Sequence, residues 1–206
     1  MKPILFNTEM VRAILEGRKT QTRRLVKNIP LQEPYFEVVD GTPYACDGDG
    51  EWHQAVEFSP IQDGDVLYVR ETFCGYYLPS PESWPEGHMH YVYKASNPNG
   101  NRRPTGPEYD DGWEEQPWRP SIHMPKEAAR LFLRVTGVRC ERLQDMTQED
   151  CANDGGFEPE AIKAVGIAPL FGTLWDSTVR KDAIKRWGWN ANPWVWVIEF
   201  ERCEKP

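Results

Sequence analysis

The sequence predicts an α+β protein built on a small curved β-barrel or mixed sheet, with flanking helices and long loop insertions. Three observations support this fold class. Segments with the apolar, β-branched composition of strands stand at both ends of the chain, at residues 2–6 and 193–202. Helical patterns lie between them, for example after residue 147. A long proline-rich stretch, residues 79–125, carries neither pattern.

The first elements are short and closely spaced. Residues 2–6 are apolar and predict a strand. Thr8 is expected to cap the helix that follows, and Gly17 is expected to end it. The apolar face of this helix comprises Met10, Val11, Ile14 and Leu15.

The segment KTQTRRL, residues 19–25, alternates with period two and predicts a strand. One face of this strand carries Lys19, Gln21 and Arg23. The other face carries Thr20, Thr22 and Arg24. With Arg18, four cations fall within seven residues of a chain whose net charge is −8, which raises the question of what this local charge is for.

The central part of the chain predicts further strands and turns. Residues 66–73 read as a strand introduced by the turn at 63–65, and residues 90–95 are its candidate partner. The sequence DGDG at 47–50 resembles a calcium loop but lacks the downstream Glu, so a hairpin turn is expected there.

The C-terminal part predicts strands on either side of two helices. Residues 129–143 are rich in β-formers. The sequence at 147–150 fits a capping box, and its helix is expected to end at 155–156. A second helix is predicted over 170–186, and the strand at 193–202 closes the series.

The chain shows no repeat and no linker, which predicts one domain over residues 1–206. Within it, the insertion at 79–125 holds nine of the 18 prolines and is expected to be a flap or a decorated loop region.

Composition excludes several classes of protein. A net charge of −8 and a pI near 5.1 argue against binding long duplex DNA, while leaving room for a local basic pocket. No apolar run reaches 18 residues, so no membrane span is expected. The five cysteines are scattered and form no CxxC, which indicates reduced thiols in a cytoplasmic protein. Neither a metal nor an organic cofactor is expected.

Several motifs resemble one family. GRKTQTRR, after an amphipathic helix, is similar to the signature segment of the ASCH family, whose fold resembles the PUA-like β-barrels that bind RNA. Four later segments resemble the longer, often phage-encoded form of that family, in matching order: GDVLYVRETF, HMPKEAARLFLRV, LQDMTQEDCANDGG and WVWVIEFER. The resemblance implies a cleft that accepts a nucleobase or short RNA. Some relatives are ribonucleases, and one is an amidohydrolase that deacetylates N4-acetylcytidine.

The resemblance also implies site residues. The Lys, Thr and Arg of the family motif GxKxxTxR fall on Lys19, Thr22 and Arg24. The acid of the later helix falls on Asp154, where relatives more often carry the longer Glu. Glu149 and Asp150 are alternative acids, although Asp150 is better explained as a helix cap.

These residues form a chemically coherent group. Thr22 would be the nucleophile, and it needs a base such as a Lys19 whose pKa is depressed by burial and by nearby cations. Asp154 would shuttle a proton or hold the exocyclic amine of a base. The expected catalytic residues are thus Lys19, Thr22 and Asp154. Ligand contacts are expected from Arg18, Thr20, Arg23, Arg24, Arg70, Glu71, Phe73 and Tyr76, with Tyr77, Trp113 and Trp118 as further stacking candidates.

Other interpretations remain open at the level of the sequence. Alternating Thr and Arg also suit a solvated strand face, and Arg70 and Glu71 also suit a cross-strand ion pair. The function predicted is binding of RNA or a modified pyrimidine nucleoside, with possible hydrolysis. The alternatives are a binding module without turnover, a ribonuclease, and a phage protein-interaction factor that uses residues 79–125 to bind a protein partner.

Overall fold

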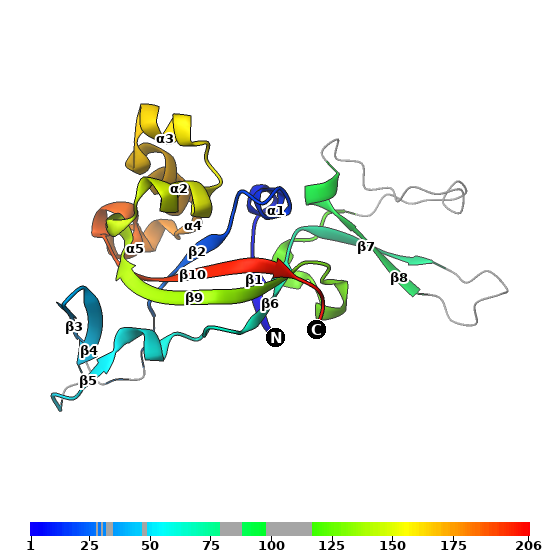
Figure 1. Ribbon diagram of the computed structural model, residues 1–206. Helices are drawn as coiled ribbons and strands as arrows, with labels where there is room; N and C mark the ends of the chain where they lie inside the picture. Colours follow the sequence, from blue (N-terminus) through cyan, green and yellow to red (C-terminus); the bar gives the residue numbers. More distant parts are fainter. Residues whose placement is uncertain (28, 30, 32–34, 47–48, 79–87, 98–116) are drawn as a thin grey trace. The chain divides into compact units, whose positions relative to one another are not determined.

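The structure is a computed structural model of the 206-residue chain. It describes residues 1–27, 29, 31, 35–46, 49–78, 88–97 and 117–206 (Figure 1). Most of the predicted insertion at 79–125 lies outside these residues, so its role stays a prediction. Among the described helices, none is long and apolar enough to cross a membrane.

The fold is α+β, as the sequence predicts, and the described strands form open sheets with no closed barrel among them. The chain divides into two compact units, each discontinuous in sequence. The first unit comprises residues 1–16, 67–133 and 203–206, and the second comprises residues 17–66 and 134–202. The prediction of one domain over residues 1–206 stays a prediction.

In the first unit, strand β1 (Lys2–Leu5) pairs in parallel with β6 (Val66–Arg70). Helix α1 (Thr8–Leu15) follows β1 and buries Val11, Ala13 and Ile14. Strands β7 (Phe73–Leu78) and β8 (His88–Tyr93) form an antiparallel hairpin. Short 3-10 helices occupy Lys94–Ser96, Ser121–His123 and Lys126–Ala128.

Two predictions in this unit are wrong in detail. The cap of α1 is Asn7 rather than Thr8, because the Asn7 side chain accepts a hydrogen bond of 2.8 Å from the Met10 amide. The strand predicted over 66–73 is interrupted, because β6 ends at Arg70 and the chain starts a new hairpin at Phe73. The predicted partner around 90–95 therefore pairs with β7, as β8, and not with β6.

In the second unit, strand β2 (Gln21–Leu25) pairs antiparallel with β10 (Trp194–Cys203). The neighbour of β10 on its other side is β9 (Phe132–Arg142), which gives the order β9-β10-β2 with β2 at the end. A separate three-stranded sheet contains β3 (Tyr35–Val39), β4 (Thr42–Cys46) and β5 (Trp52–Gln54), followed by a 3-10 helix at Ala55–Phe58. The antiparallel pairing of β4 with β5 confirms the hairpin predicted around the DGDG sequence.

Helices of the second unit cover one face of β9, β10 and β2 (Figure 1). Helix α2 (Gln148–Gly155) has the predicted capping box, formed by Thr147 and Asp150, and ends at Gly156 with φ 67°. Helix α3 (Pro159–Val165) follows. A 3-10 helix at Leu143–Asp145 precedes α2, and another at Trp189–Ala191 precedes β10. The core between helices and sheet consists of Leu143, Met146, Cys151, Ile162, Phe171, Trp175, Val195 and Val197.

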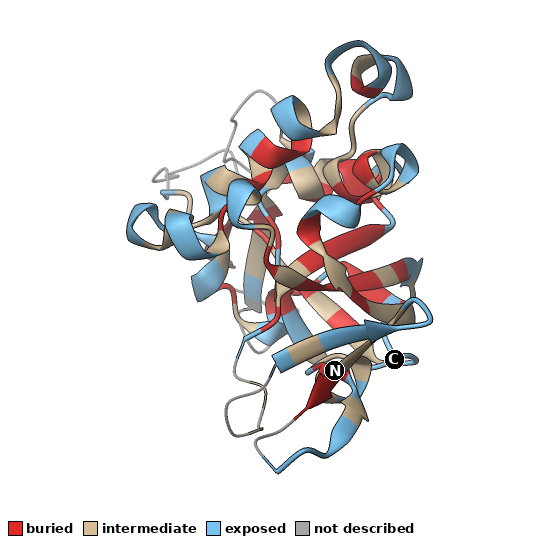
Figure 2. Ribbon diagram, turned by 90° about the vertical axis from the view of Figure 1, so that its left-hand side faces the viewer, coloured by how far each residue is buried: buried red, intermediate tan, exposed pale blue. Residues whose placement is uncertain are grey.

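The single helix predicted over 170–186 is wrong. A π-helical turn at Ala168–Gly172 leads into α4 (Thr173–Thr178), then into a 3-10 helix at Lys181–Ala183 and α5 (Ile184–Trp187). The break falls where Ser177 and Thr178 hydroxyls bond to carbonyls three residues back and Val179 becomes extended, with ψ 136°. Figure 2 shows buried positions along the central strands and on parts of the helices, whereas outer helix turns and some strands, such as β3, are exposed.

Candidate functional site

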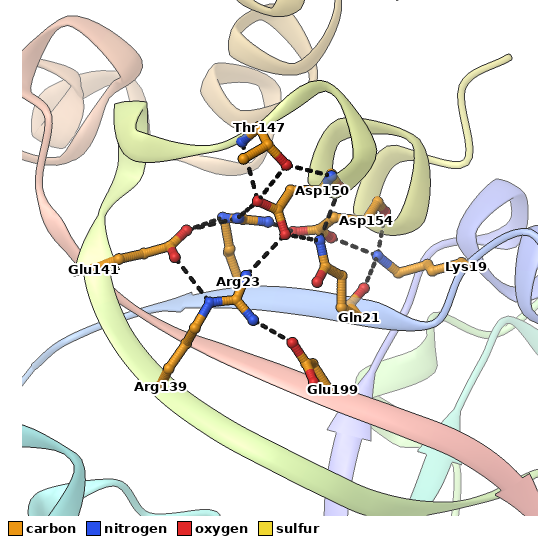
Figure 3. A network of polar contacts seen from close by, with 9 residues as sticks. All are labelled: Lys19, Gln21, Arg23, Arg139, Glu141, Thr147, Asp150, Asp154 and Glu199. Atoms are coloured by element: carbon orange, nitrogen blue, oxygen red, sulfur yellow. Dashed lines mark hydrogen bonds and ion pairs between the residues drawn. The ribbon is translucent and has the colours of Figure 1, made fainter. Parts of the chain in front are cut away.

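The candidate site lies entirely in the second unit, where β2 passes beneath helix α2 (Figure 3). Gln21 and Arg23 share one face of β2, and Lys19 lies two residues before the strand. All three side chains reach acidic residues of α2, as the predicted alternation of KTQTRRL requires. The predicted face of this strand is therefore confirmed.

Lys19 and Asp154 form a buried ion pair. Lys19 Nζ lies 2.6 Å from Asp154 Oδ1, and the two side chains are 0% and 3% exposed. The same ammonium donates to Gln21 O at 2.9 Å and to the main-chain carbonyl of Asp154. Burial lowers the pKa of Lys19, and the charges of Arg24 and Arg23 lower it further, whereas the negative charge of Asp154 opposes this shift.

Arg23 joins three carboxylates. Its Nη2 lies 2.6 Å from Glu141 Oε1 and 3.5 Å from Asp150 Oδ2, and its Nη1 lies 3.3 Å from Asp154 Oδ2. Because the Arg23 side chain is fully buried, this guanidinium holds β2, β9 and α2 together and has no exposed surface for a ligand.

Asp150 combines capping with charge pairing. Its carboxylate accepts from the Thr147 amide at 3.0 Å, from Gln21 Nε2 at 2.8 Å and from Arg139 Nη2 at 2.8 Å. Although burial raises the pKa of Asp150, the hydrogen bonds from Thr147 and Gln21 and the charge of Arg23 bring it below its ordinary range. Asp150 is therefore a charged cap at neutral pH.

Three members of this network were not predicted from the sequence: Arg139, Glu141 and Glu199. Arg139 Nε lies 2.9 Å from Glu141 Oε2, and Arg139 also contacts Glu199 on β10. Arg139 and Glu141 are two residues apart on a strand, which places them on the same face; this was the available signal.

Thr22 and Arg24 belong to the opposite face of β2 from Gln21 and Arg23. Thr22 is buried, and within the described part of the chain its hydroxyl has no hydrogen-bond partner. The structure thus brings Lys19 and Asp154 together and directs Thr22 away from the face where Arg23 meets Asp154. Arg24 is half-buried, and burial lowers its pKa.

Arg18 and Thr20 lie just before the same strand, β2. The Arg18 guanidinium donates to Gly156 O just beyond α2. The Thr20 amide donates to Asn153 O at 2.9 Å, and Thr20 O accepts from the Phe200 amide at 2.8 Å. Both residues therefore help to position β2 against α2 and β10.

The remaining predicted site residues belong to the first unit. Arg70 Nε donates to Met124 O at 2.9 Å, and Glu71 forms a two-pronged pair with Arg130 at 2.9 and 3.0 Å. Glu71 is therefore part of an ion pair with a neighbouring segment of the chain, as the alternative interpretation expected, whereas Arg70 bonds to a main-chain carbonyl. Phe73 is buried in this unit. The side chains of Tyr76 and Tyr77, and Trp113 as a whole, lie outside the described residues.

A cavity of about 550 Å³ borders the end strand, and we call it the first cavity. One wall is formed by residues 23–25 and 27, and the other by residues of α4, α5 and the segment between them. Its charged and aromatic side chains belong to Arg24, Lys27, Arg180, Asp182, Trp175 and Trp187, whereas Arg23 also borders the cavity but has a fully buried side chain. None of Lys27, Arg180, Trp175 and Trp187 was among the predicted site residues.

A second cavity, of about 480 Å³, is lined by Lys27 and Trp187 as well. Its other charged and aromatic residues are Phe36, Arg142, Arg186 and Trp194. The Arg142 guanidinium lies 4.3 Å from the Trp194 ring centroid, and the Phe36 ring stacks on Trp194 at 5.1 Å.

Strand β2 also presents main-chain groups to the first cavity. On either side of β2, the Val26 amide donates to Trp194 O and the Phe200 amide donates to Thr20 O. Because hydrogen-bonded residues alternate along an antiparallel pair, the main-chain groups of β2 that bond to β10 are those of Thr22 and Arg24. The amide and carbonyl groups of Arg23 and Leu25 therefore point outward from the end strand. Both residues border the first cavity.

The described residues contain no group of three or more His, Cys, Asp or Glu placed to hold a metal ion. Comparisons with protein-family models, with curated proteins and with solved structures find no match.

Proposed function

We propose that the second unit binds single-stranded RNA or a modified pyrimidine nucleotide in the first cavity, as a binding module. The observation that carries the proposal is the lining of this cavity, which joins arginine and lysine side chains to two tryptophans in a chain of net charge −8. The proposal includes the ASCH, PUA-like fold that the GRKTQTRR segment suggests. It is supported by the position of this segment, directly after a helix and on the end strand of a sheet.

Charge favours an anionic ligand. Arg180 is matched by Asp182, with Nη2 and Oδ2 2.6 Å apart, so these two contribute little net charge. Lys27, which is exposed, leaves the lining positive. Phosphate groups are the natural partners for such cations, whereas the acidic remainder of the surface disfavours long nucleic acids.

The aromatic residues favour a planar group next to the phosphate. Trp175 Nε1 donates to Trp187 O at 2.8 Å, which ties the two tryptophan-bearing segments together. Trp187 is half-buried, so part of its ring remains accessible. Stacking of a base on an aromatic ring contributes about 1–3 kcal/mol. The outward amide and carbonyl groups of Arg23 and Leu25 can bond to the edge of a stacked base.

The buried pair favours binding without turnover. Lys19 and Asp154 are enclosed, and each is already engaged by charged or main-chain partners. A substrate would have to displace these contacts before either group could transfer a proton. Their role in the proposed binding module is to fix the position of β2, which supplies one wall of the first cavity.

The test is fluorescence anisotropy with a short labelled single-stranded RNA. The variant Lys27→Ala is expected to weaken binding and to reduce the slope of log K against log salt by about one. Lys185→Ala is the matched control, because Lys185 is an exposed lysine on α5 that lines neither cavity. Equal loss in both variants, or no binding by the wild type, would overturn the proposal.

A second candidate is hydrolysis of N4-acylated cytidine, in which water adds to the amide and releases cytidine and the free acid. One observation favours it: burial lowers the pKa of Lys19, as a lysine base requires. A chromatographic turnover assay on N4-acetylcytidine tests it. The variant Thr22→Val keeps the shape of the side chain and leaves the Lys19–Asp154 pair in place. Cytidine formed by the wild type and not by this variant would establish the hydrolase, and no product from the wild type would exclude this reaction.

A further inference from the structure

The two cavities of the second unit share two lining residues, Lys27 and Trp187. Lys27 Nζ lies 5.9 Å from the centroid of the Trp187 ring, and the Arg186 guanidinium lies 4.6 Å from the same ring. Trp187 therefore stands at the junction of the cavities with two cations beside its ring. A ligand that fills both cavities must pass this junction.

The second cavity repeats the chemistry of the first. It has a half-buried tryptophan, Trp194, with its ring held between Phe36 and the Arg142 guanidinium. Arg142 Nη1 also donates to Asn192 O at 3.1 Å, which fixes its position. Each cavity thus offers a planar group for stacking, the Trp187 ring in the first and the Arg142 guanidinium over Trp194 in the second. Both volumes fall in the range of about 300–1,000 Å³ typical of small-ligand sites.

The charges along this path are almost all positive. Among the described residues, Lys27, Arg142 and Arg186 form no ion pair with a carboxylate. Asp182 is the one acidic residue in the lining of either cavity, and it is paired with Arg180. Cations alternating with aromatic rings along a groove are the usual arrangement for binding an unpaired nucleic acid strand, with phosphates on the cations and bases on the rings.

We infer that the two cavities are neighbouring nucleotide subsites of one track, so that the ligand is a single-stranded oligonucleotide of at least two nucleotides and not a free nucleoside. This inference rests on the proposed function and specifies its ligand class. One base stacks on Trp187 in the first cavity, and the next stacks on the outer face of the Arg142 guanidinium, which lies over Trp194 in the second. The phosphate that joins them lies near Lys27 and Arg186.

An acidic extended peptide is the competing occupant, since the end strand β2 has outward main-chain groups that suit strand pairing. The lining of the second cavity favours the oligonucleotide over the peptide. From the stretch that continues β2 its lining includes Val26, Lys27 and Ile29, and the rest comes from β3, β9, α5, β10 and the segment before β10. A peptide paired along β2 would therefore leave Trp194 and Arg142 without a partner.

The experiment is isothermal titration of the full chain with cytidine monophosphate and with the phosphorylated dinucleotide of cytidine, as RNA and as DNA. The dinucleotide is expected to bind about tenfold or more tightly than the mononucleotide, because a second stacked base adds to the affinity. The RNA and DNA arms show whether the 2′-hydroxyl contributes. Equal affinity for mononucleotide and dinucleotide would overturn the inference but leave the proposed function intact, whereas no binding of either would overturn both.

Variants locate the second subsite. Arg186→Glu is expected to abolish most of the gain from the second nucleotide, while Lys185→Glu, an exposed neighbour outside both linings, retains it. Trp194→Ala is expected to lose the additional affinity for the dinucleotide and to keep the affinity for the mononucleotide. Thermal melting of this variant checks that it is folded. If a glutamate-rich peptide competes with the dinucleotide and its binding survives Trp194→Ala, the track is a peptide groove and the inference fails.

Discussion

The substitution Asp154→Asn is expected to lower the free energy of unfolding by about 3–5 kcal/mol, which is the usual cost of removing one partner of a buried ion pair. Lys19 Nζ and Asp154 Oδ1 are 2.6 Å apart, and both side chains are almost completely enclosed. With an effective dielectric constant of about 20, their attraction at this distance is about 6 kcal/mol. Part of the loss is offset, because Lys19 keeps its hydrogen bond to Gln21 O.

The reciprocal change, Lys19→Met, is expected to cost less. Asp154 would still face the Arg23 guanidinium, with Nη1 3.3 Å from Oδ2, so its charge would not be left without a counterion. The double variant Lys19→Met/Asp154→Leu removes both charges and is expected to be more stable than the sum of the single effects predicts.

The assay is urea unfolding followed by circular dichroism at neutral pH. Asp182→Asn is the control, because it removes an ion pair whose side chains are exposed and is expected to cost less than about 1 kcal/mol. If Asp154→Asn costs no more than Asp182→Asn, then the buried pair does not hold β2 in place and the reasoning is refuted.

Three further predictions concern the rest of the chain. Asp150→Asn should lower stability at pH 7 by about 0.5–2 kcal/mol in urea unfolding. Because hydrogen bonds and the charge of Arg23 hold the folded pKa of Asp150 below its ordinary 3.8, the difference from wild type should shrink as the pH falls below that value, and a difference that stays constant would contradict this role. Gly172→Ala should lower stability by about 1–3 kcal/mol in thermal melting, because the added Cβ would lie 2.9 Å from Trp189 Cγ; an unchanged melting temperature would contradict this packing. A thiol reagent should modify Cys203 quickly and the four buried cysteines slowly; Cys203→Ser should then have no fast thiol.

Local patterns were sufficient to predict the elements that frame the site. The capping box at 147–150 and the glycines after it define α2 through side-chain and main-chain contacts within a few residues. The period-two pattern of KTQTRRL correctly placed Lys19, Gln21 and Arg23 together, because successive side chains on a strand point to opposite faces. These signals need no knowledge of the rest of the fold.

The partners of those side chains could not be predicted in the same way. Glu141 meets Arg23 across 118 residues of sequence, and the pairing depends on β9 and β2 lying on either side of β10. The wall of the first cavity opposite β2 depends on the break after α4, where hydroxyl groups compete for main-chain carbonyls. A continuous helix over 170–186, as the apolar pattern predicted, would not place Trp175 and Trp187 in this arrangement.

The position of β2 at the end of its sheet has a consequence for how the protein behaves in concentrated solution. A strand edge with outward amide and carbonyl groups is a template for pairing with the same edge of another molecule. Arg24 and Lys27 beside that edge repel a second copy, and salt screens this repulsion. High ionic strength should therefore promote self-association through this edge.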